Sequence, residues 1–231
     1  MNPSPRYSLV VPFFNEAGNI LPLIASAAEV LEMMRGDWEA ILVNDGSTDA
    51  TADEIELCIA RWPQCRVLNK PQNCGQAAAL LDGLRAARGD FIFTMDGDGQ
   101  NDPRDLPALL EHLDTERLDL ACGWRHNRHD SFLRLGMSRL ANLVRGRLLG
   151  DHFHDSGCQL RVMRREVVAA LFPFELLQSF IPAVVLAAGF KVGEFRVRHH
   201  PRTRGEAKYG FRQLWLRPML AMFRLRRLLR R

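Results

Sequence analysis

The sequence lacks several features that would assign it to other classes of protein. Its five cysteines form no Cys-x-x-Cys motif, and their odd number argues against a disulfide framework or a zinc site. The first residues contain no apolar segment typical of a signal peptide, and the longest apolar stretch, near residues 180–190, is too short to span a bilayer. We therefore expect a protein of the reducing cytoplasm that does not cross a membrane by itself.

Acidic residues are absent from the C-terminal segment, residues 212–231, which contains seven arginines. The net charge of the whole chain is only +4, so the rest of the chain carries a slight negative charge. After Pro218 the apolar residues recur with helical spacing, at Met219, Met222, Leu225, Leu228 and Leu229. This pattern predicts a basic amphipathic helix on an anionic membrane surface. The alternatives are a helix that caps the core and a nucleic-acid-binding arm; of the three we expect the membrane contact and no nucleic-acid partner.

The rest of the sequence contains enough apolar residues to bury a core. With 231 residues, 47% of them hydrophobic, the chain is expected to form one domain, residues 1–211, followed by the basic segment 212–231. Strand-like and helix-like segments alternate, which predicts a doubly wound, mostly parallel α/β sheet flanked by helices. The predicted strands are 7–12, 38–44, 65–69, 91–95 and 118–123, and the predicted helices are about 17–35, 49–61, 74–88 and 103–115.

The most informative motif is a pair of aspartates at the end of a predicted buried strand. The apolar run 91–95 leads directly into Asp96 and Asp98, and Gly97 and Gly99 let the chain turn there. Two neighbouring carboxylates repel each other, whereas Mg²⁺ or Mn²⁺ takes oxygen ligands and leaves positions for substrate phosphates. The pair therefore indicates a metal site; an Asp-Gly turn on a surface loop is the alternative.

Two other predicted strands also lead into polar side chains. Strand 7–12 leads into Asn15 and Glu16, and strand 38–44 leads into Asp45. Because ligands of open α/β sheets bind at the carboxyl edge of the strands, we expect these groups to lie along the same edge as the aspartate pair. Each motif alone is compatible with an ordinary turn. It would be a coincidence, however, if all three strands ended in polar turns without a shared function.

Together these motifs resemble those of the family 2 inverting glycosyltransferases. The resemblance rests on Pro12-x-x-Asn15-Glu16, Asn44-Asp45-Gly46-Ser47-Thr48-Asp49 and Asp96-Gly-Asp98-Gly-Gln100-x-Asp-Pro103. Further motifs resemble those of the dolichol- and polyprenyl-phosphate sugar synthases, namely Gly123-Trp-Arg125, Arg139 in a basic segment, Asp155-Ser-Gly157-Cys-Gln-Leu-Arg161 and Arg204-Gly-Glu-Ala-Lys208-Tyr209. The similarity covers roughly residues 7–211, with Asn44 and Ala207 standing where an Asp and a Ser are usual.

The resemblance implies a GT-A-like fold with a catalytic domain over residues 1–211, and it implies roles for the matched residues. On the donor side, the residues implied to hold the metal are Asp96, Asp98 and Gln100. The residues implied to bind the nucleotide are Pro12, Asn15, Glu16, Asp45 and Asp96. On the acceptor side, Arg125 and Arg139 are implied to bind a phosphate, and Arg204 and Lys208 are implied to approach the donor diphosphate or that phosphate from a loop.

We expect from this resemblance an inverting, metal-dependent transfer of a sugar from a GDP- or UDP-sugar to a polyprenyl phosphate, at the cytoplasmic face of a membrane. A phosphate acceptor is already an anion and needs positioning more than a general base, a task that suits the planar fork of arginine. One alternative is a family 2 enzyme acting on a hydroxyl of a cell-envelope glycan, with Asp155 as the base. Another is a non-catalytic nucleotide-binding module.

Overall fold

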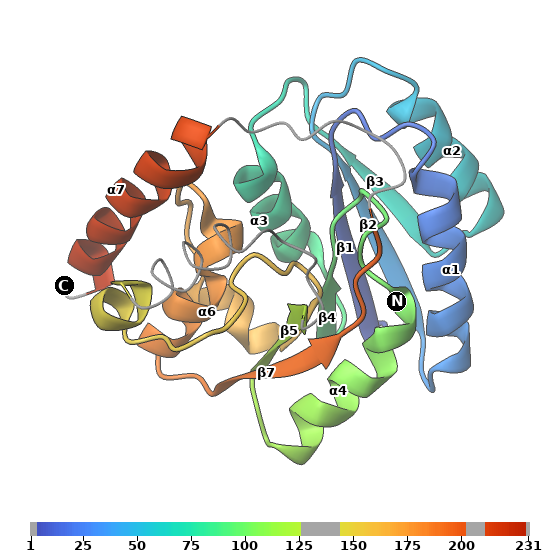
Figure 1. Ribbon diagram of the computed structural model, residues 1–231. Helices are drawn as coiled ribbons and strands as arrows, with labels where there is room; N and C mark the ends of the chain where they lie inside the picture. Colours follow the sequence, from blue (N-terminus) through green and yellow to red (C-terminus); the bar gives the residue numbers. More distant parts are fainter. Residues whose placement is uncertain (1–3, 126–143, 202–210, 230–231) are drawn as a thin grey trace.

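The computed structural model describes residues 4–125, 144–201 and 211–229, and the side chains of the last helix from residue 218 onward. A seven-stranded sheet lies at the centre, with helices on both faces (Figure 1). Its strand order is β3-β2-β1-β4-β6-β5-β7. The predicted α/β architecture with a mostly parallel sheet is therefore confirmed.

The first half of the chain follows the predicted alternation closely. The strands at 7–13, 38–44 and 91–94 are mostly apolar and rich in β-branched or aromatic residues, which suits strands covered on both faces. The strands of this half are β1 (Tyr7–Phe13), β2 (Trp38–Asn44), β3 (Cys65–Asn69), β4 (Phe91–Thr94) and β5 (Leu120–Arg125). The helices between them are α1 (Ile20–Met33), α2 (Thr51–Arg61), α3 (Gln76–Ala86) and α4 (Leu106–Thr115), the last preceded by a 3-10 turn, η1 (Pro103–Asp105).

The second half adds elements that the sequence pattern did not predict. They are β6 (Arg161–Arg164), the 3-10 segment η2 (Arg165–Ala170), α6 (Leu177–Ala187) and β7 (Val192–Val197), and residues 144–149 are also helical. Strand β6 inserts between β4 and β5 and runs antiparallel to both. The expected run of parallel strands is thus interrupted once, and β5 and β7 form a parallel pair beyond the interruption.

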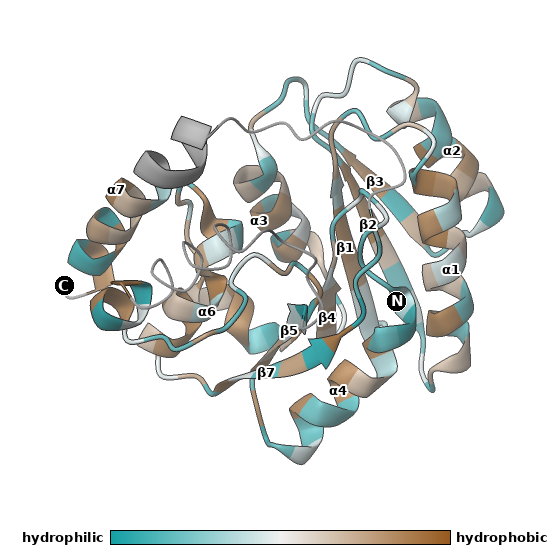
Figure 2. Cartoon of the chain, in the orientation of Figure 1, coloured by the Kyte–Doolittle hydropathy of each residue, from teal (hydrophilic) through white to brown (hydrophobic). Residues whose placement is uncertain are grey.

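Two hydrophobic clusters fix the helices to the two faces of the sheet. One cluster packs α1, α2 and α4 against one face, and the other packs α3, α6 and α7 (Phe211–Leu229) against the opposite face. Figure 2 shows hydrophobic residues concentrated in the central strands. Because both faces are covered, only the ends of the strands and their connecting loops remain for ligand binding.

Helix α7 shows that the predicted grouping of its apolar residues is partly wrong. Met222 and Leu225 are buried against the cluster that contains α3 and α6, whereas Met219 and Leu228 are 43% and 46% exposed. The reason is that α7 packs through the side that carries Ala221, Met222 and Leu225, so Met219 points away from the core and Leu228 lies at the border of the packed side. Within the ranges that the structure describes, no helix combines the length and apolar character needed to cross a membrane.

At the opposite edge of the sheet from the strand exits, Glu39 anchors β2 through a buried carboxylate. It accepts hydrogen bonds from Ser8 Oγ at 2.8 Å, from Arg88 Nη2 at 2.8 Å and from Arg66 Nε at 3.0 Å. Burial raises the pKa of Glu39, but these hydrogen bonds outweigh that effect and lower the pKa below its ordinary value of 4.5. The ionised carboxylate therefore stabilises the fold above pH 4.5, and this contribution is lost as the pH falls through the lowered pKa.

Replacing Glu39 by Gln is expected to lower the free energy of unfolding near neutral pH by about 1.5–3 kcal/mol, the range for hydrogen bonds to a charged group. The difference from the unsubstituted protein should shrink in acid, where Glu39 itself becomes protonated. Urea denaturation over a range of pH measures both quantities. Glu56→Gln, at an exposed position of α2, is the matched control. A stability loss independent of pH would contradict a role for the charge.

Candidate active site

The predicted acid pair lies where β4 leaves the sheet. Gly97 packs directly on β1, because a Cβ atom there would come within 2.4 Å of the Phe13 ring. This contact holds the turn against the neighbouring strand. Asp98 is 7% exposed, and its Oδ1 accepts a hydrogen bond from the backbone N–H of Gln100 at 3.1 Å. Asp96 Oδ1 accepts a hydrogen bond of 2.7 Å from Gln76 Nε2, at the start of α3.

The loops after β1 and β2 are bonded to each other. Asn15 adopts a left-handed backbone conformation with φ of 52°, which Asn tolerates better than most residues. Its side-chain Oδ1 accepts a bond of 2.8 Å from the N–H of Thr48, and its own N–H donates to Ser47 Oγ at 3.1 Å. Glu16 continues the same link, since its N–H donates to Thr51 Oγ1 at 2.9 Å. The first two predicted motifs therefore form one structural unit.

Asp45, which was predicted to bind the nucleotide, also has a structural role that the sequence did not reveal. It is 2% exposed, and its two carboxylate oxygens accept the backbone N–H groups of Cys74 and Gly75, each at 2.9 Å. Next to it, Gly46 has a φ of +68° and lies so close to Gln72 that a Cβ atom would clash with the backbone. Asp45 thus holds the loop between β3 and α3 over the end of β2, and its contact with a nucleotide remains a prediction.

The side chain of Arg125 forms an ion pair within the protein, whereas the sequence led us to expect an arginine available to a phosphate. Its Nε and Nη2 donate to the two carboxylate oxygens of Asp155 at 2.6 and 2.8 Å, and the Arg125 and Asp155 side chains are 13% and 5% exposed. Burial lowers the pKa of Arg125, but the bonds to Asp155 outweigh it and raise the pKa above its ordinary value. Glu194 accepts the N–H of Asp155 at 3.1 Å, and the N–H of Gly157 donates to Asp155 at 3.2 Å. Asp155 therefore orients Arg125 from a well-fixed turn.

A strap connects β7 to the segment that follows the acid pair. Asn101 and His199 form an antiparallel bridge, and the N–H of His200 donates to the carbonyl of Gln100 at 2.9 Å. His200 Nε2 lies 3.0 Å from Asp102 Oδ2. Burial raises the pKa of Asp102, but hydrogen bonds from Arg104 and His200 outweigh it and hold the pKa well below its usual range. The strap brings the chain back to the acid pair just before residues 202–210.

The structure thus brings most of the predicted site residues to one edge of the sheet, at the ends of β1, β2, β4 and β5 and on the loops that follow these strands. These residues are Pro12, Asn15, Glu16, Asp45, Asp96, Asp98, Gln100 and Arg125. The predicted residues Arg139, Arg204 and Lys208 lie outside the described residues. Sequence reasoning missed the contributions of Gln76, Glu194 and His200, which depend on tertiary contacts. Only Asp102 had a local signal, since it precedes Pro103 inside the acidic motif.

The donor atoms at this edge fit a hard divalent cation whose remaining coordination positions are filled by substrate. In the described ranges, no group of three or more His, Cys, Asp or Glu residues is placed to hold a metal. Two carboxylates, Asp96 and Asp98, nevertheless suit Mg²⁺ or Mn²⁺, because such ions are commonly held by one or two carboxylates together with water and phosphate oxygens. Asp96, Asp98 and Gln100 therefore stay the predicted protein ligands of the metal.

Known structures share this fold. A glucosyl-3-phosphoglycerate synthase from Mycobacterium tuberculosis, solved with Mn²⁺, UDP and phosphoglyceric acid, superposes with a TM-score of 0.69 at 21% identity and covers 96% of this chain and 78% of its own. A mannosyltransferase from Pyrobaculum calidifontis, in complex with GDP-Man and Mn²⁺, gives a TM-score of 0.64 at 18% identity, covering 97% and 64%. The fold is thus that of the GT-A glycosyltransferases.

The sequence comparison gives the family. The model of glycosyl transferase family 2 matches residues 8–172, well over half of the chain, and the chain belongs to this family. A dodecaprenyl-phosphate galacturonate synthase from Rhizobium johnstonii is 42% identical over 207 residues, which is 88% of this chain and 61% of that protein. An undecaprenyl-phosphate 4-deoxy-4-formamido-L-arabinose transferase from Pseudomonas paraeruginosa is 37% identical over 213 residues, or 90% and 61%. The chain thus spans about three fifths of the length of these relatives.

Proposed function

We propose that this protein transfers a sugar, with inversion, from a GDP- or UDP-sugar to the phosphate of a polyprenyl lipid such as undecaprenyl or dolichyl phosphate. The observation that supports this most is the acid pair at the exit of β4 in a family 2 fold, beside an oriented arginine. Asp96 follows the end of β4 and Arg125 ends β5, and only β6 lies between these two strands in the sheet. The relatives named for dodecaprenyl and undecaprenyl phosphate support a lipid phosphate as acceptor.

On the donor side, the chain orients the nucleotide sugar through rigid loops. Asp98, Asp96 and Gln100 would hold Mg²⁺ or Mn²⁺, which when bound supplies positive charge for the departing diphosphate. The interlocked Asn15 and Asp45 loops provide a fixed wall for the base and ribose. Because these loops are held by several hydrogen bonds, they offer a preorganised pocket, which favours catalysis by positioning.

On the acceptor side, the geometry favours an anion over a hydroxyl. A hydroxyl acceptor would require a general base, and Asp155 is poorly suited, since both of its carboxylate oxygens accept hydrogen bonds from Arg125. A phosphate acceptor requires no base, and the oriented Arg125 supplies positive charge beside the donor site. We assign Arg139, Arg204 and Lys208 to the same phosphate groups on the basis of their motifs.

A transfer assay tests the proposal. GDP-mannose, UDP-glucose and UDP-N-acetylglucosamine are incubated with the protein, Mn²⁺ and either undecaprenyl or dolichyl phosphate, and lipid-linked sugar is measured. We expect product only with a lipid phosphate, and none after chelation with EDTA. Transfer to a soluble glycan without lipid phosphate would support the hydroxyl-acceptor alternative. Nucleotide binding without turnover on any acceptor would support the non-catalytic one.

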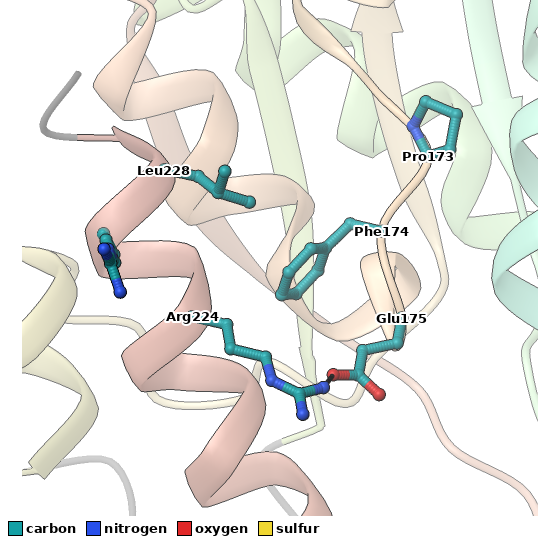
Figure 3. A pocket seen from close by; sticks show the side chains of 6 residues that line it. Pro173, Phe174, Glu175, Arg224 and Leu228 are labelled. Atoms are coloured by element: carbon teal, nitrogen blue, oxygen red, sulfur yellow. Dashed lines mark hydrogen bonds and ion pairs between the residues drawn. The ribbon is translucent and has the colours of Figure 1, made fainter.

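We further propose that the protein contacts the cytoplasmic face of a membrane through α7. Leu220 and Phe223 are 58% and 53% exposed on the side of the helix that faces away from the core. On the same helix, a groove of about 510 Å³ runs between α7 and the segment 173–175 (Figure 3), with Arg224 bound to Glu175 and with Phe174 and Leu228 in its lining. Apolar side chains flanked by arginines suit an anionic lipid surface.

Replacing Leu220 and Phe223 by Ser is expected to weaken binding to vesicles that contain phosphatidylglycerol, because each buried side chain contributes about 1.5–3 kcal/mol. Nucleotide affinity should stay unchanged. Leu57→Ser in α2 is a matched control, since Leu57 is also 58% exposed. Point replacements are preferable to removal of residues 218–231, which would also expose the core beneath Met222 and Leu225. Unchanged cosedimentation of the double variant would show that this surface does not bind the membrane.

A further inference from the structure

Arg161 is a buried arginine whose place in the fold is unusual. It is 0% exposed and heads the set of largest wholly buried side chains. Its Nη2 donates to two backbone carbonyls, that of Gln178 at 2.7 Å and that of Ser156 at 3.3 Å. Its Nε and Nη1 have no hydrogen-bond partner among the described residues. The guanidinium is therefore held by carbonyl dipoles, and part of its donor capacity is unused.

Stability does not account for an arginine at this position. Burial of a cation without a carboxylate partner is strongly unfavourable, and well-packed apolar residues at buried charged positions are often as stable or more so. Met163 lies two residues further along β6 and on the same face, and it shows that this face of the strand accepts a buried apolar side chain. The contacts of Arg161, and not its burial, therefore indicate what it does.

Those contacts connect it to the acceptor side of the site. The carbonyl of Ser156 belongs to the turn whose Asp155 carboxylate holds Arg125. The turn and Arg125 are in close contact, because a Cβ atom on Gly157 would come within 2.9 Å of Arg125 Nη2. A small displacement of the turn would thus be passed on to Arg125.

The sheet register places Arg161 between the two halves of the site. It lies opposite Thr94 on β4, two residues before Asp96, and opposite Cys122 on β5, three residues before Arg125. Thr94 Oγ1 donates to the carbonyl of Gln159 at 2.7 Å, so β4 and the approach to β6 are joined at the same level. The segment from Asp155 to Arg161 therefore connects β4, which leads to the acid pair, with the ion pair of Arg125.

We propose that Arg161 is a positioning residue for the transfer reaction. By fixing the carbonyl of Ser156, it sets the turn that orients Arg125 against the donor site, without touching the substrate itself. This inference deepens the proposed function and rests on it.

The test compares Arg161→Met and Arg161→Lys with the unsubstituted protein. Arg161→Met is expected to unfold at an equal or higher temperature and to bind the nucleotide normally. It should lose turnover by about tenfold to a hundredfold, as displaced catalytic groups do. Arg161→Lys should recover part of this loss, since it restores a donor without the planar fork. Met163→Leu, in the same strand and on the same face, controls for general disturbance of β6.

A double-variant comparison separates positioning from a general structural effect. If Arg161 acts through Arg125, adding Arg161→Met to a protein that already carries Arg125→Met and Asp155→Leu should cause no further loss of turnover. A full additional loss there, or turnover of Arg161→Met within about twofold of the unsubstituted protein, would overturn the proposal. Should Arg161→Met not fold, Arg161→Lys decides: full turnover overturns the proposal, and reduced turnover at unchanged nucleotide affinity supports it. Failure of the proposed function is seen separately, as absence of transfer by the unsubstituted protein.

Discussion

Replacing Asp98 by Asn is expected to reduce sugar transfer by at least about a hundredfold, because a bound metal ion contributes several kcal/mol of transition-state stabilisation. The substitution removes one negative charge from the acid pair with little change in shape. The hydrogen bond from the N–H of Gln100 to the side chain can persist, since an amide oxygen also accepts it. The loop conformation should therefore survive, and the loss should be one of metal affinity and turnover.

A radiolabelled transfer assay over a range of Mn²⁺ concentrations measures this effect. Asp53→Asn, at an exposed position in the first turn of α2, removes the same charge far from the acid pair in sequence and should leave transfer unchanged. Thermal unfolding of both variants verifies that the fold is intact. Activity of Asp98→Asn within a few-fold of the unsubstituted protein, or full turnover in EDTA, would exclude the metal assignment.

Replacing Arg125 alone by Met is expected to destabilise the protein by about 3–5 kcal/mol, because it leaves the buried Asp155 carboxylate without its guanidinium partner. A loss of activity in that variant would be ambiguous. The double replacement Arg125→Met with Asp155→Leu should restore stability, since exchange of both members of a buried ion pair for apolar residues is often neutral or stabilising. We expect the double variant to fold and bind nucleotide but to transfer sugar to the lipid phosphate about tenfold to a hundredfold more slowly than the unsubstituted protein, as for the loss of hydrogen bonds to a charged group.

Chemical denaturation gives the stability of the single and double variants, and titration calorimetry with the nucleotide gives donor affinity. Transfer kinetics at varied lipid phosphate then show whether the acceptor side is damaged. If the double variant recovers normal transfer, the ion pair serves the fold alone and Arg125 has no role in binding the acceptor.

The first half of the fold and the position of the motifs after β1, β2 and β4 could be predicted from the sequence because their signals are local. A run such as 38–44 is apolar except for Glu39 and Asn44, and its exit is marked by Asp45 and Gly46. The same locality explains why the acid pair was found. Its partners were not, because the bond from Gln76 to Asp96 joins residues twenty positions apart.

The second half could not be predicted because its signals depend on tertiary contacts. Strand β6 has only four residues, and two of them are Arg161 and Arg164, which obscure any apolar pattern. The pairing of Arg125 with Asp155 spans thirty positions, so the sequence shows two polar residues and no reason to join them. For α7 the helical spacing was recognised, but which apolar residues face inward depends on the packing of α6 beneath it.

The antiparallel insertion of β6 has a consequence for how the chain folds during synthesis. Strand β4 is complete at residue 94, but its neighbour on one side is not made until residue 161. Until then the growing chain carries a sheet of four neighbouring strands, β3-β2-β1-β4, in which β4 is an open edge, and open edges are sites of faulty pairing between chains. Chain truncations that end before β6 should therefore aggregate, while those that include it can close the sheet around β4.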